Sequence, residues 1–347
     1  MIAIQNIYYM LSYAFQVLNE QGYKNIATEE FDNTAELCAA ILSRGIAVQV
    51  KRGLGREYIP QTESRAALRG KLEIADSIKN RTILKKQMIC TYDEFSVNSY
   101  MNRIIKSTIM LLLHSDITKA RKKELRKLMM YFSDVEELDL HHINWDIQYK
   151  RNNQTYRMLI TICYLVVKGL LQTQSDGSTK LMDFLDEQRM SHLYEKFILE
   201  YYRREFPQIT ANASQIPWQL DNGEKEFLPI MQSDIMLHFQ EKTLIIDAKY
   251  YNKTMQVQFN KRTLHSANLY QIFTYVKNKE AELKDQPHEV SGMLLYAQTD
   301  EDIFPGNEYQ MSGNRICVRT LDLNQKFPLI ADQLNTIAER YLGVKAA

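Results

Sequence analysis

The sequence predicts a multi-domain α+β protein, with a small β domain and a helical middle segment before a C-terminal α/β domain that has a central mixed sheet. Short runs of alternating polarity fill residues 46–95, and helical spacing of apolar residues then dominates as far as residue 172. Helices alternate with apolar strands from residue 188 onward, which is typical of a sheet with helices on its faces. The 347 residues suffice for two or three domains, which we place at 1–95, 96–175 and 176–347.

The N-terminal domain is predicted to combine short strands with flanking helices. Apolar residues recur at helical spacing over residues 4–19, and a second helix is expected at about 34–43. The expected strands alternate in polarity, have Gly or Pro around their turns, and lie at residues 46–53, 56–64, 70–74 and 87–95.

The middle segment is predicted to be helical. Residues 98–115 place apolar side chains on one face, and residues 117–132 follow with a basic face. That face consists of Lys119, Arg121, Lys122, Lys123, Arg126 and Lys127, with Glu124 interrupting the run. Such a face is typical of a solvated helix and also of a surface that contacts nucleic-acid phosphates, and the sequence leaves both interpretations open. A strongly apolar helix at 154–172 and a linker at 173–180 complete the segment.

The C-terminal domain is predicted from the order helix, two strands, helix, two strands, helix. The helices are expected at 188–205, 266–280 and 324–342, and the strands at 231–239, 242–251, 292–298 and 315–323. Gln240 and Glu241 separate the first two strands by a distance that suits a hairpin. The order describes a mixed sheet with helices on its faces.

Composition and charge exclude several classes of protein. The net charge of +1 gives no global field for a polyanion, so a nucleic-acid surface has to be a local patch. The cysteines Cys38, Cys90, Cys163 and Cys317 form no CxxC pair, which argues against a zinc site and a disulfide framework, and the adjacent His141 and His142 are interpreted as structural. The sequence shows no signal peptide and no apolar run long enough to span a bilayer, so we expect a cytoplasmic protein without membrane contact.

The residues with the clearest chemical meaning are Asp234, Asp247 and Lys249. The apolar run Leu244-Ile245-Ile246 leads into Asp247-Ala248-Lys249, and strand alternation places Asp247 and Lys249 on the same face. Three consecutive apolar residues indicate a central strand that is buried on both sides. Charges at the end of such a strand are costly unless they are paired or bind a metal, and hairpin pairing would bring Asp234 beside Asp247.

Two carboxylates and a lysine on adjacent strands suit phosphodiester hydrolysis. Carboxylates are hard oxygen ligands for Mg²⁺, which polarises a phosphoryl group and helps to generate a hydroxide nucleophile. Lys249 is then placed to position the attacking water or to stabilise charge on the phosphate. The alternative is a structural Asp–Lys pair on a surface hairpin.

This constellation resembles the PD-(D/E)xK nuclease superfamily, with Asp234, a spacer and Asp247-Ala248-Lys249 matching its motif. The resemblance implies a C-terminal nuclease fold of that type. It also implies that Glu195, in the preceding helix, is a third acidic metal ligand besides Asp234 and Asp247. Gln271 and Tyr275, in the following helix, match its Q-x-x-x-Y element and share one helix face. The sequence departs from the pattern where Ser233 replaces Pro and Asp247 replaces Glu.

Further segments resemble the McrC family, the nuclease subunit of the McrBC 5-methylcytosine-dependent restriction system. They begin with Gln5-Asn6-Ile7-Tyr8-Tyr9-Met10-Leu11-Ser12-Tyr13-Ala14 and continue through Arg69-Gly70-Lys71-Leu72-Glu73-Ile74, Asn102-Arg103-Ile104-Ile105-Lys106-Ser107-Thr108, Asp247-Ala248-Lys249-Tyr250-Tyr251 and Asn268-Leu269-Tyr270-Gln271. Because these matches follow in order over nearly the whole chain, the resemblance extends beyond the nuclease motif.

The resemblance implies a Mg²⁺-dependent DNA endonuclease subunit that acts on methylated DNA together with a McrB-like AAA+ GTPase oligomer, whose GTP hydrolysis it stimulates. The sequence has no G-x-x-x-x-G-K-[ST] loop, so the nucleotide site is expected on another chain. Residues 1–95 are the expected docking region, with Arg52, Arg56 and Arg65 as candidate contacts or as plain solvated arginines. The alternatives are a catalytically inert activator of the AAA+ partner and a stand-alone repair nuclease or resolvase.

Overall fold

The computed structural model describes residues 4–15, 18, 26, 29, 31, 33–149, 154–176, 187–221, 223–224, 226–250, 255–258, 261–298 and 305–346. The chain divides into two compact units. The sheet unit comprises residues 1–31 and 182–347, and the arm unit comprises residues 32–181. Together they form a mixed α+β protein. Across the described residues, every helix is too short or too polar to cross a bilayer.

The sheet unit is built on a six-stranded mixed sheet with the strand order β12-β13-β11-β8-β7-β4. Its strands are β4 (Thr210–Asn212), β7 (Ile235–Phe239), β8 (Lys242–Lys249), β11 (Glu289–Ala297), β12 (Glu308–Met311) and β13 (Asn314–Leu321). β11 runs parallel to β8 and β13, whereas β7, β4 and β12 join the sheet antiparallel to their neighbours. The predicted central mixed sheet is therefore confirmed, and β8 is one of its interior strands.

Two short hairpins accompany this sheet, and both were missed from the sequence. β5 (Gln215–Ile216) pairs with β6 (Met231–Gln232), and β9 (Met255–Gln258) pairs with β10 (Lys261–Leu264). The predicted strand 231–239 is thus split into β6 and β7, because Ser233 and Asp234 leave the ladder between them. This interruption frees the Asp234 side chain from the regular alternation of a strand.

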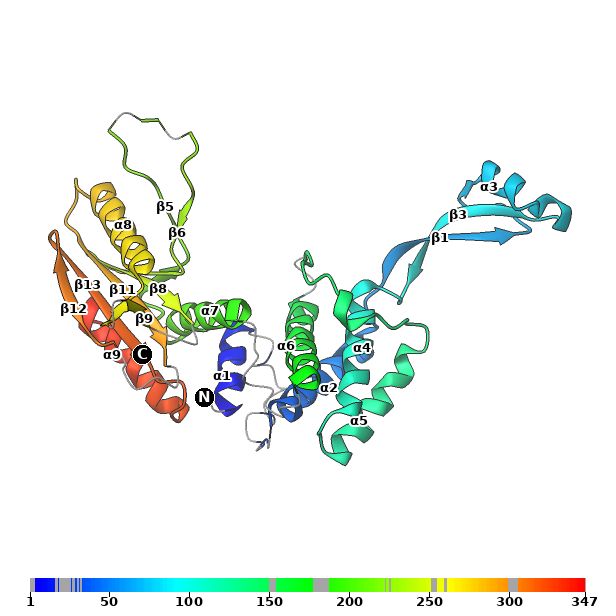
Figure 1. Cartoon of the computed structure of the whole chain (residues 1–347), viewed down its shortest axis with the longest axis horizontal. Helices are drawn as coiled ribbons and strands as arrows, with labels where there is room; N and C mark the ends of the chain where they lie inside the picture. The colour runs from blue at the N-terminus through cyan, green and yellow to red at the C-terminus, as the bar shows by residue number, and fades with distance from the viewer. Residues whose placement is uncertain are drawn as a thin grey trace. The chain divides into compact units, whose positions relative to one another are not determined.

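Helices cover both faces of the sheet (Figure 1). α8 (Ser266–Glu282) packs on β11 and β8, where Ile272 and Val276 join Ile245, Leu294 and Ile316 in a buried apolar cluster. α7 (Glu187–Glu205) and α9 (Phe327–Leu342) also pack against β8. Alternate residues of β8 therefore face different helices, and Leu244, Ile245 and Ile246 are all fully buried.

The N-terminal helix α1 (Ile4–Ala14) belongs to the sheet unit, where it packs on α7. The Asn6 amide donates hydrogen bonds to the backbone oxygens of Leu323, at 2.8 Å, and Gln325, at 2.6 Å. Tyr13 Oη donates to Glu205 at 2.8 Å. The structure therefore differs from the predicted domains 1–95 and 96–175: the first helix joins the C-terminal unit through contacts distant in sequence, and residues 32–181 form one unit.

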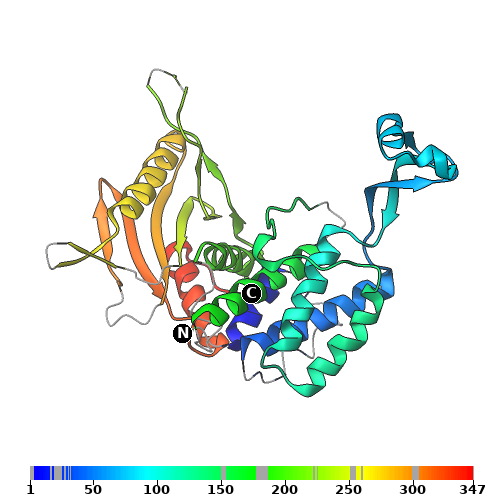
Figure 2. The same cartoon turned by 45° about the vertical axis from the view of Figure 1, so that its right-hand side comes forward.

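The arm unit consists of packed helices and a long antiparallel hairpin. Its helices are α2 (Thr34–Arg52), α3 (Ile74–Lys79), α4 (Tyr100–His114), α5 (Lys119–Met129) and α6 (Gln154–Asp176). β1 (Glu57–Arg65) pairs with β3 (Met88–Ser96) along its whole length, and β2 (Lys71–Leu72) pairs with β3 on the other side. Figures 1 and 2 show this hairpin projecting from the helices of its unit, with α3 at the distal end. We call residues 57–96 the arm.

Residues 46–53 were predicted to be a strand, and this prediction is wrong. They form the C-terminal part of α2, whose N-cap Asn33 accepts a hydrogen bond from Glu36 N at 2.8 Å. Ile46 and Gln49 lie on the buried side of the helix, and Gly53 ends it with a positive φ of 87°. Short alternating runs resemble strands, so tertiary packing rather than the local pattern decides this segment. The predicted linker starts inside α6, and its residues 177–180 lie outside the described residues.

A buried polar cluster holds the base of the arm against the helices. The Asn102 amide donates to the backbone oxygens of Gly55 and Val97, both at 2.8 Å, and Tyr156 Oη donates to Asn102 Oδ1 at 2.7 Å. Gly55 N donates to Tyr156 Oη at 2.7 Å. A Cβ at position 55 would lie 2.9 Å from Tyr156 Oη, so the close approach requires glycine here.

Replacing Tyr156 by phenylalanine is expected to destabilise the arm unit by about 1–3 kcal/mol, because the buried Asn102 Oδ1 and the partly buried Gly55 N would both lose this partner. Denaturant unfolding of the full chain measures the loss. Tyr131→Phe is the matched control, since Tyr131 is exposed and belongs to the same unit. Equal stability of the two variants would contradict the role of the cluster.

Candidate active site

The β7–β8 hairpin brings the two predicted aspartates together. β7 and β8 pair antiparallel from Phe239↔Lys242 to Ile235↔Ile246, so Asp234, immediately before β7, reaches the level of Asp247. Gln240 has a positive φ of 53° in the two-residue turn. Asp234 Oδ2 accepts a hydrogen bond from Ala248 N at 2.9 Å, which fixes this carboxylate beside the end of β8. The predicted hairpin is therefore confirmed.

Asp247 is buried without a set of hydrogen-bond donors. Its side chain is 1% exposed, and within the described part of the chain no group donates a well-aligned hydrogen bond to Oδ1 or Oδ2. Lys249 Nζ lies 2.9 Å from Asp247 Oδ2 as an ion pair. Burial raises the pKa of Asp247, and Lys249 opposes that rise only in part. The carboxylate thus occupies a position that calls for an additional positive charge.

The positive charge around Asp234 is likewise too small to compensate its carboxylate. Burial, reinforced by the negative charges of Asp247 and Glu195, raises its pKa to about 8, although Lys249 and the hydrogen bond from Ala248 act in the opposite direction. In a buried environment, ionising both of two acids that share one ammonium group costs free energy. Within the described residues, the Asp234–Asp247 pair is therefore an acidic centre that lacks sufficient positive charge.

Lys249 connects the acid pair to α8. It faces the same side of the sheet as Asp247, and its Nζ donates to Gln271 Oε1 at 3.4 Å. Gln271 Nε2 in turn donates to Tyr275 Oη at 3.0 Å, and Tyr275 is buried. The structure brings all three predicted residues together, and Gln271 and Tyr275 orient the ammonium group of Lys249.

Glu195 lies close enough to act on both aspartates electrostatically, and its charge raises the pKa of Asp234 and of Asp247. Its own oxygens are occupied, since Ser191 Oγ donates to Oε1 at 3.0 Å and His192 Nδ1 lies 3.1 Å from Oε2. These partners are found at i−4 and i−3 on α7, a spacing from which the contacts were predictable. Glu195 is therefore a neighbour of the acid pair, and the Glu195 side chain is held by partners on its own helix.

A buried hydrogen-bonded pair next to the site was not predicted from the sequence. Asn268 Nδ2 donates to Tyr296 Oη at 3.0 Å, and Tyr296 lies opposite Lys249 in the β11–β8 register. Both side chains are buried. They tie the first turn of α8 to β11 and so help to set the position of Gln271 relative to Lys249. No spacing signal marks this pair in the sequence, because its partners lie 28 residues apart.

The donor set at this site fits a hard divalent cation. Asp247 Oδ1 is buried without a partner among the described residues, Asp247 Oδ2 is ion-paired with Lys249, and Asp234 has one oxygen beyond the one bound by Ala248 N. Carboxylate oxygens are the ligands that Mg²⁺ prefers, with water completing its shell. The described residues contain no group of three or more His, Cys, Asp or Glu side chains that is arranged to hold a metal ion. Asp234 and Asp247 thus have oxygens available to a cation, and the Glu195 charge acts on both of them.

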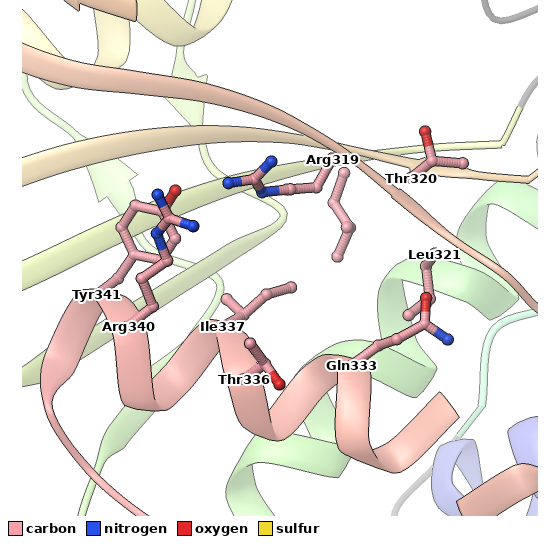
Figure 3. Close-up of a pocket in the computed structure, with 9 residues that line it drawn as sticks. Arg319, Thr320, Leu321, Gln333, Thr336, Ile337, Arg340 and Tyr341 are labelled. Atoms are coloured by element: carbon pink, nitrogen blue, oxygen red, sulfur yellow. The ribbon is translucent and has the colours of Figure 1, made fainter. Parts of the chain in front are cut away.

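A separate cavity of about 290 Å³ lies between α9 and β13 (Figure 3). Leu295, Leu321 and Ile337 form its apolar walls, and Arg319 and Arg340 lie at its edge. Leu295 alternates with Leu294 and Tyr296 on β11, whose side chains join the cluster that α8 covers. The cavity therefore lies on the sheet face opposite to α8 and includes none of the predicted site residues.

The cysteines and His142 behave as ordinary structural groups. The four cysteines are buried thiols, and His142 pairs with Asp139 on the surface. In the arm unit, Arg65 Nη1 lies 2.7 Å from Glu63 and donates to Tyr92 Oη at 2.9 Å. Arg56 lies over the ring of Phe95. Arg52 and Arg56 are exposed, so both are accessible to a partner.

Comparison with known proteins identifies the family of this chain. Residues 4–297 match the family described as McrBC 5-methylcytosine restriction system component. The type IV methyl-directed restriction enzyme EcoKMcrBC of Escherichia coli K12 is 30% identical over 348 residues, covering 98% of this chain and 98% of that protein. These two matches extend over both units of the structure.

Two solved structures from Thermococcus gammatolerans also resemble this chain. A refined half-complex of McrB AAA+ hexamers with bound McrC gives a TM-score of 0.46 at 18% identity, over 96% of this chain and 76% of that chain. The McrBC complex gives a TM-score of 0.41 at 19% identity, over 58% of each chain. From the family match and the relative in E. coli, this chain belongs to the family of McrBC 5-methylcytosine restriction system components.

Proposed function

We propose that this chain is the DNA endonuclease subunit of a methylcytosine-dependent restriction complex, and that its sheet unit is a PD-(D/E)xK nuclease domain. The observation that carries the proposal is the buried Asp247 carboxylate, which has no well-aligned hydrogen-bond donor among the described residues and lies beside Asp234 and Lys249. A purely structural ion pair would satisfy both carboxylate oxygens, whereas here Lys249 reaches Oδ2 and leaves Oδ1 without a partner among the described residues. Family membership agrees with a role in restriction.

The residues of the site divide the proposed chemistry among them. Asp234 and Asp247 would hold Mg²⁺, with Glu195 acting on it from the neighbouring helix. When bound, the ion supplies Lewis-acid polarisation of the scissile phosphate and a lower pKa for water. Lys249 stabilises negative charge on the phosphate and orients the attacking water. Gln271 and Tyr275 hold the Lys249 ammonium group in place through their hydrogen bonds.

The proposed partner is an AAA+ GTPase of the McrB type, whose GTP hydrolysis this chain stimulates. The sequence contains no Walker A loop, so a GTP-dependent reaction needs a second chain. The distal part of the arm exposes large apolar side chains, namely Leu68, Ile74, Ile78, Ile83 and Leu84. An exposed apolar patch on a projecting element is typical of a protein-binding surface. We assign partner docking to the arm, with Arg52, Arg56 and Arg65 near or along it.

A reconstitution experiment tests this function. The purified chain is incubated with Mg²⁺ and methylated DNA, alone or with a McrB-type partner and GTP, and unmethylated DNA serves as the matched substrate. We expect cleavage of methylated DNA only when partner and GTP are present. Comparable cleavage by the isolated chain would instead favour a stand-alone nuclease. Stimulated GTP hydrolysis without any cleavage would favour an inert activator.

A further inference from the structure

The exposed face of α5 presents a continuous row of basic side chains. Lys119, Lys123 and Lys127 follow one another at i,i+4 spacing, which stacks them on one face of the helix, and Lys122 and Arg126 flank them one turn apart. Leu125 is the buried side chain of this helix, so the row points away from the packed edge. Within the described residues, none of these five cations lies within ion-pair distance of a carboxylate.

Glu124 does not interrupt this row, although its place in the sequence led us to expect an interruption. The Glu124 carboxylate lies 2.9 Å from Arg121 Nη1 on the flank of α5, and Arg121 also reaches Glu36 Oε1 at 3.2 Å. The acid of this helix is thus held on the flank by an arginine that is not part of the row. The five remaining cations form a patch of uniform positive charge.

A buried carboxylate holds α5 in a fixed position. Glu36 of α2 is 7% exposed and accepts hydrogen bonds from Thr118 N at 2.9 Å and from Thr118 Oγ1 at 3.1 Å. Thr118 is also the N-cap of α5 and accepts from Arg121 N at 3.2 Å. The row is therefore presented on a helix whose N-terminus is anchored to the body of the arm unit.

Local stability does not explain this arrangement. Like charges at i,i+4 destabilise a helix, and the row contains Lys119–Lys123, Lys123–Lys127 and Lys122–Arg126. Lys119 also places a positive charge in the first turn, which has no acidic residue. A positive charge at this end of a helix interacts unfavourably with the helix dipole. A surface that opposes the local preferences of its helix is typical of a binding site.

We propose that α5 is a second DNA-contacting surface, which binds the phosphate backbone of the duplex outside the acid pair and without regard to sequence. The row from Lys119 to Lys127 extends about 12 Å along the helix, and B-DNA carries one charge for roughly each 1.7 Å of its axis. Four of the five cations are lysines, which act as point charges and lack the planar fork that reads base edges. This inference rests on the proposed function in one respect: that function identifies the polyanion as DNA.

The test measures binding of the full chain to a labelled unmethylated duplex in EDTA, so that cleavage plays no part. The triple variant Lys119→Gln, Lys123→Gln, Lys127→Gln is compared with the wild type between 50 and 200 mM salt. Each phosphate contact contributes about 0.9 to the slope of log K against log salt, so the slope should fall by about 2.7. Over this range the wild type should lose about 40-fold more affinity than the variant.

Two controls make the result specific. Lys119→Arg, Lys123→Arg, Lys127→Arg keeps the charge and should keep the wild-type slope. Lys51→Gln, Arg157→Gln, Lys168→Gln removes the same charge from exposed sites of the same unit outside the arm and should also keep it. An unchanged slope in the α5 glutamine variant overturns the proposal. The proposal is also overturned if that variant keeps its DNA affinity but no longer stimulates a GTPase partner. That result would show that α5 binds an acidic surface of the partner protein. Binding that depends on α5 in a chain unable to cut DNA would refute the proposed function alone.

Discussion

Replacing Asp247 by asparagine is expected to reduce DNA cleavage by the reconstituted complex at least about a thousandfold, because the loss of a metal-binding charge removes several kcal/mol of transition-state stabilisation. The same change should not lower the stability of the metal-free chain. Asp247 is 1% exposed, burial raises its pKa, and a neutral amide of the same shape is easier to bury there. Cleavage of labelled DNA and thermal unfolding in EDTA measure the two effects.

Asp285→Asn is the matched control, since Asp285 is exposed on the same unit and the chemical change is identical. It should leave both cleavage and stability unchanged. Stimulation of GTP hydrolysis by Asp247→Asn should also persist, because the arm belongs to a different unit from the acid pair. Near-normal cleavage by Asp247→Asn would refute the site, whereas lost cleavage together with a large loss of stability would point to a structural role for Asp247.

The contribution of Asp234 to the stability of the metal-free chain is expected to fall as the pH rises. Its pKa is about 8 in the folded chain, whereas the ordinary pKa of an aspartate, 3.8, applies to the unfolded chain. Between these values the folded state binds the extra proton, so stability decreases with rising pH across this window and levels off above it. Relative to the wild type, Asp234→Asn should therefore gain on the order of several kcal/mol between about pH 5 and pH 9.

Denaturant unfolding of both proteins in EDTA across this pH range measures the difference. Because only the difference between the two proteins is compared, the titration of other acids largely cancels. Saturating Mg²⁺ should abolish most of the pH dependence in the wild type, since a bound cation replaces the proton on the acid pair. A stability difference that stays constant with pH would show that Asp234 is an ordinary ionised surface acid.

Local signals in the sequence were sufficient to predict the acid pair. The apolar run before Asp247 predicted an interior strand, and the two-residue spacer predicted a hairpin that brings Asp234 alongside. The Gln271–Tyr275 spacing predicted a shared helix face, which the structure places beside Lys249. These features depend on alternation and helical periodicity, which a sequence displays directly.

The remaining features depend on contacts between distant residues. Asn6 fastens α1 to the chain around Leu323, more than 300 positions away, which no periodicity reveals. Glu36 of α2 anchors the N-terminus of α5 through Thr118, and Arg121 holds Glu124 away from the basic row. Residues 46–53 alternate like a strand but become helical because α2 packs against α6 and α4. In each case a partner that is remote in sequence decides between two locally acceptable structures.

Direct measurement of cation binding tests the acid pair most simply. Mn²⁺ is titrated as a spectroscopic probe into the wild-type chain and into the Asp247→Asn and Asp285→Asn variants, with no DNA or nucleotide present. We predict a site that binds Mn²⁺ in the wild type and in Asp285→Asn, is competed by Mg²⁺, and is lost in Asp247→Asn. Equal binding by all three proteins would contradict the assignment of Asp234 and Asp247 as the metal-binding centre of a nuclease.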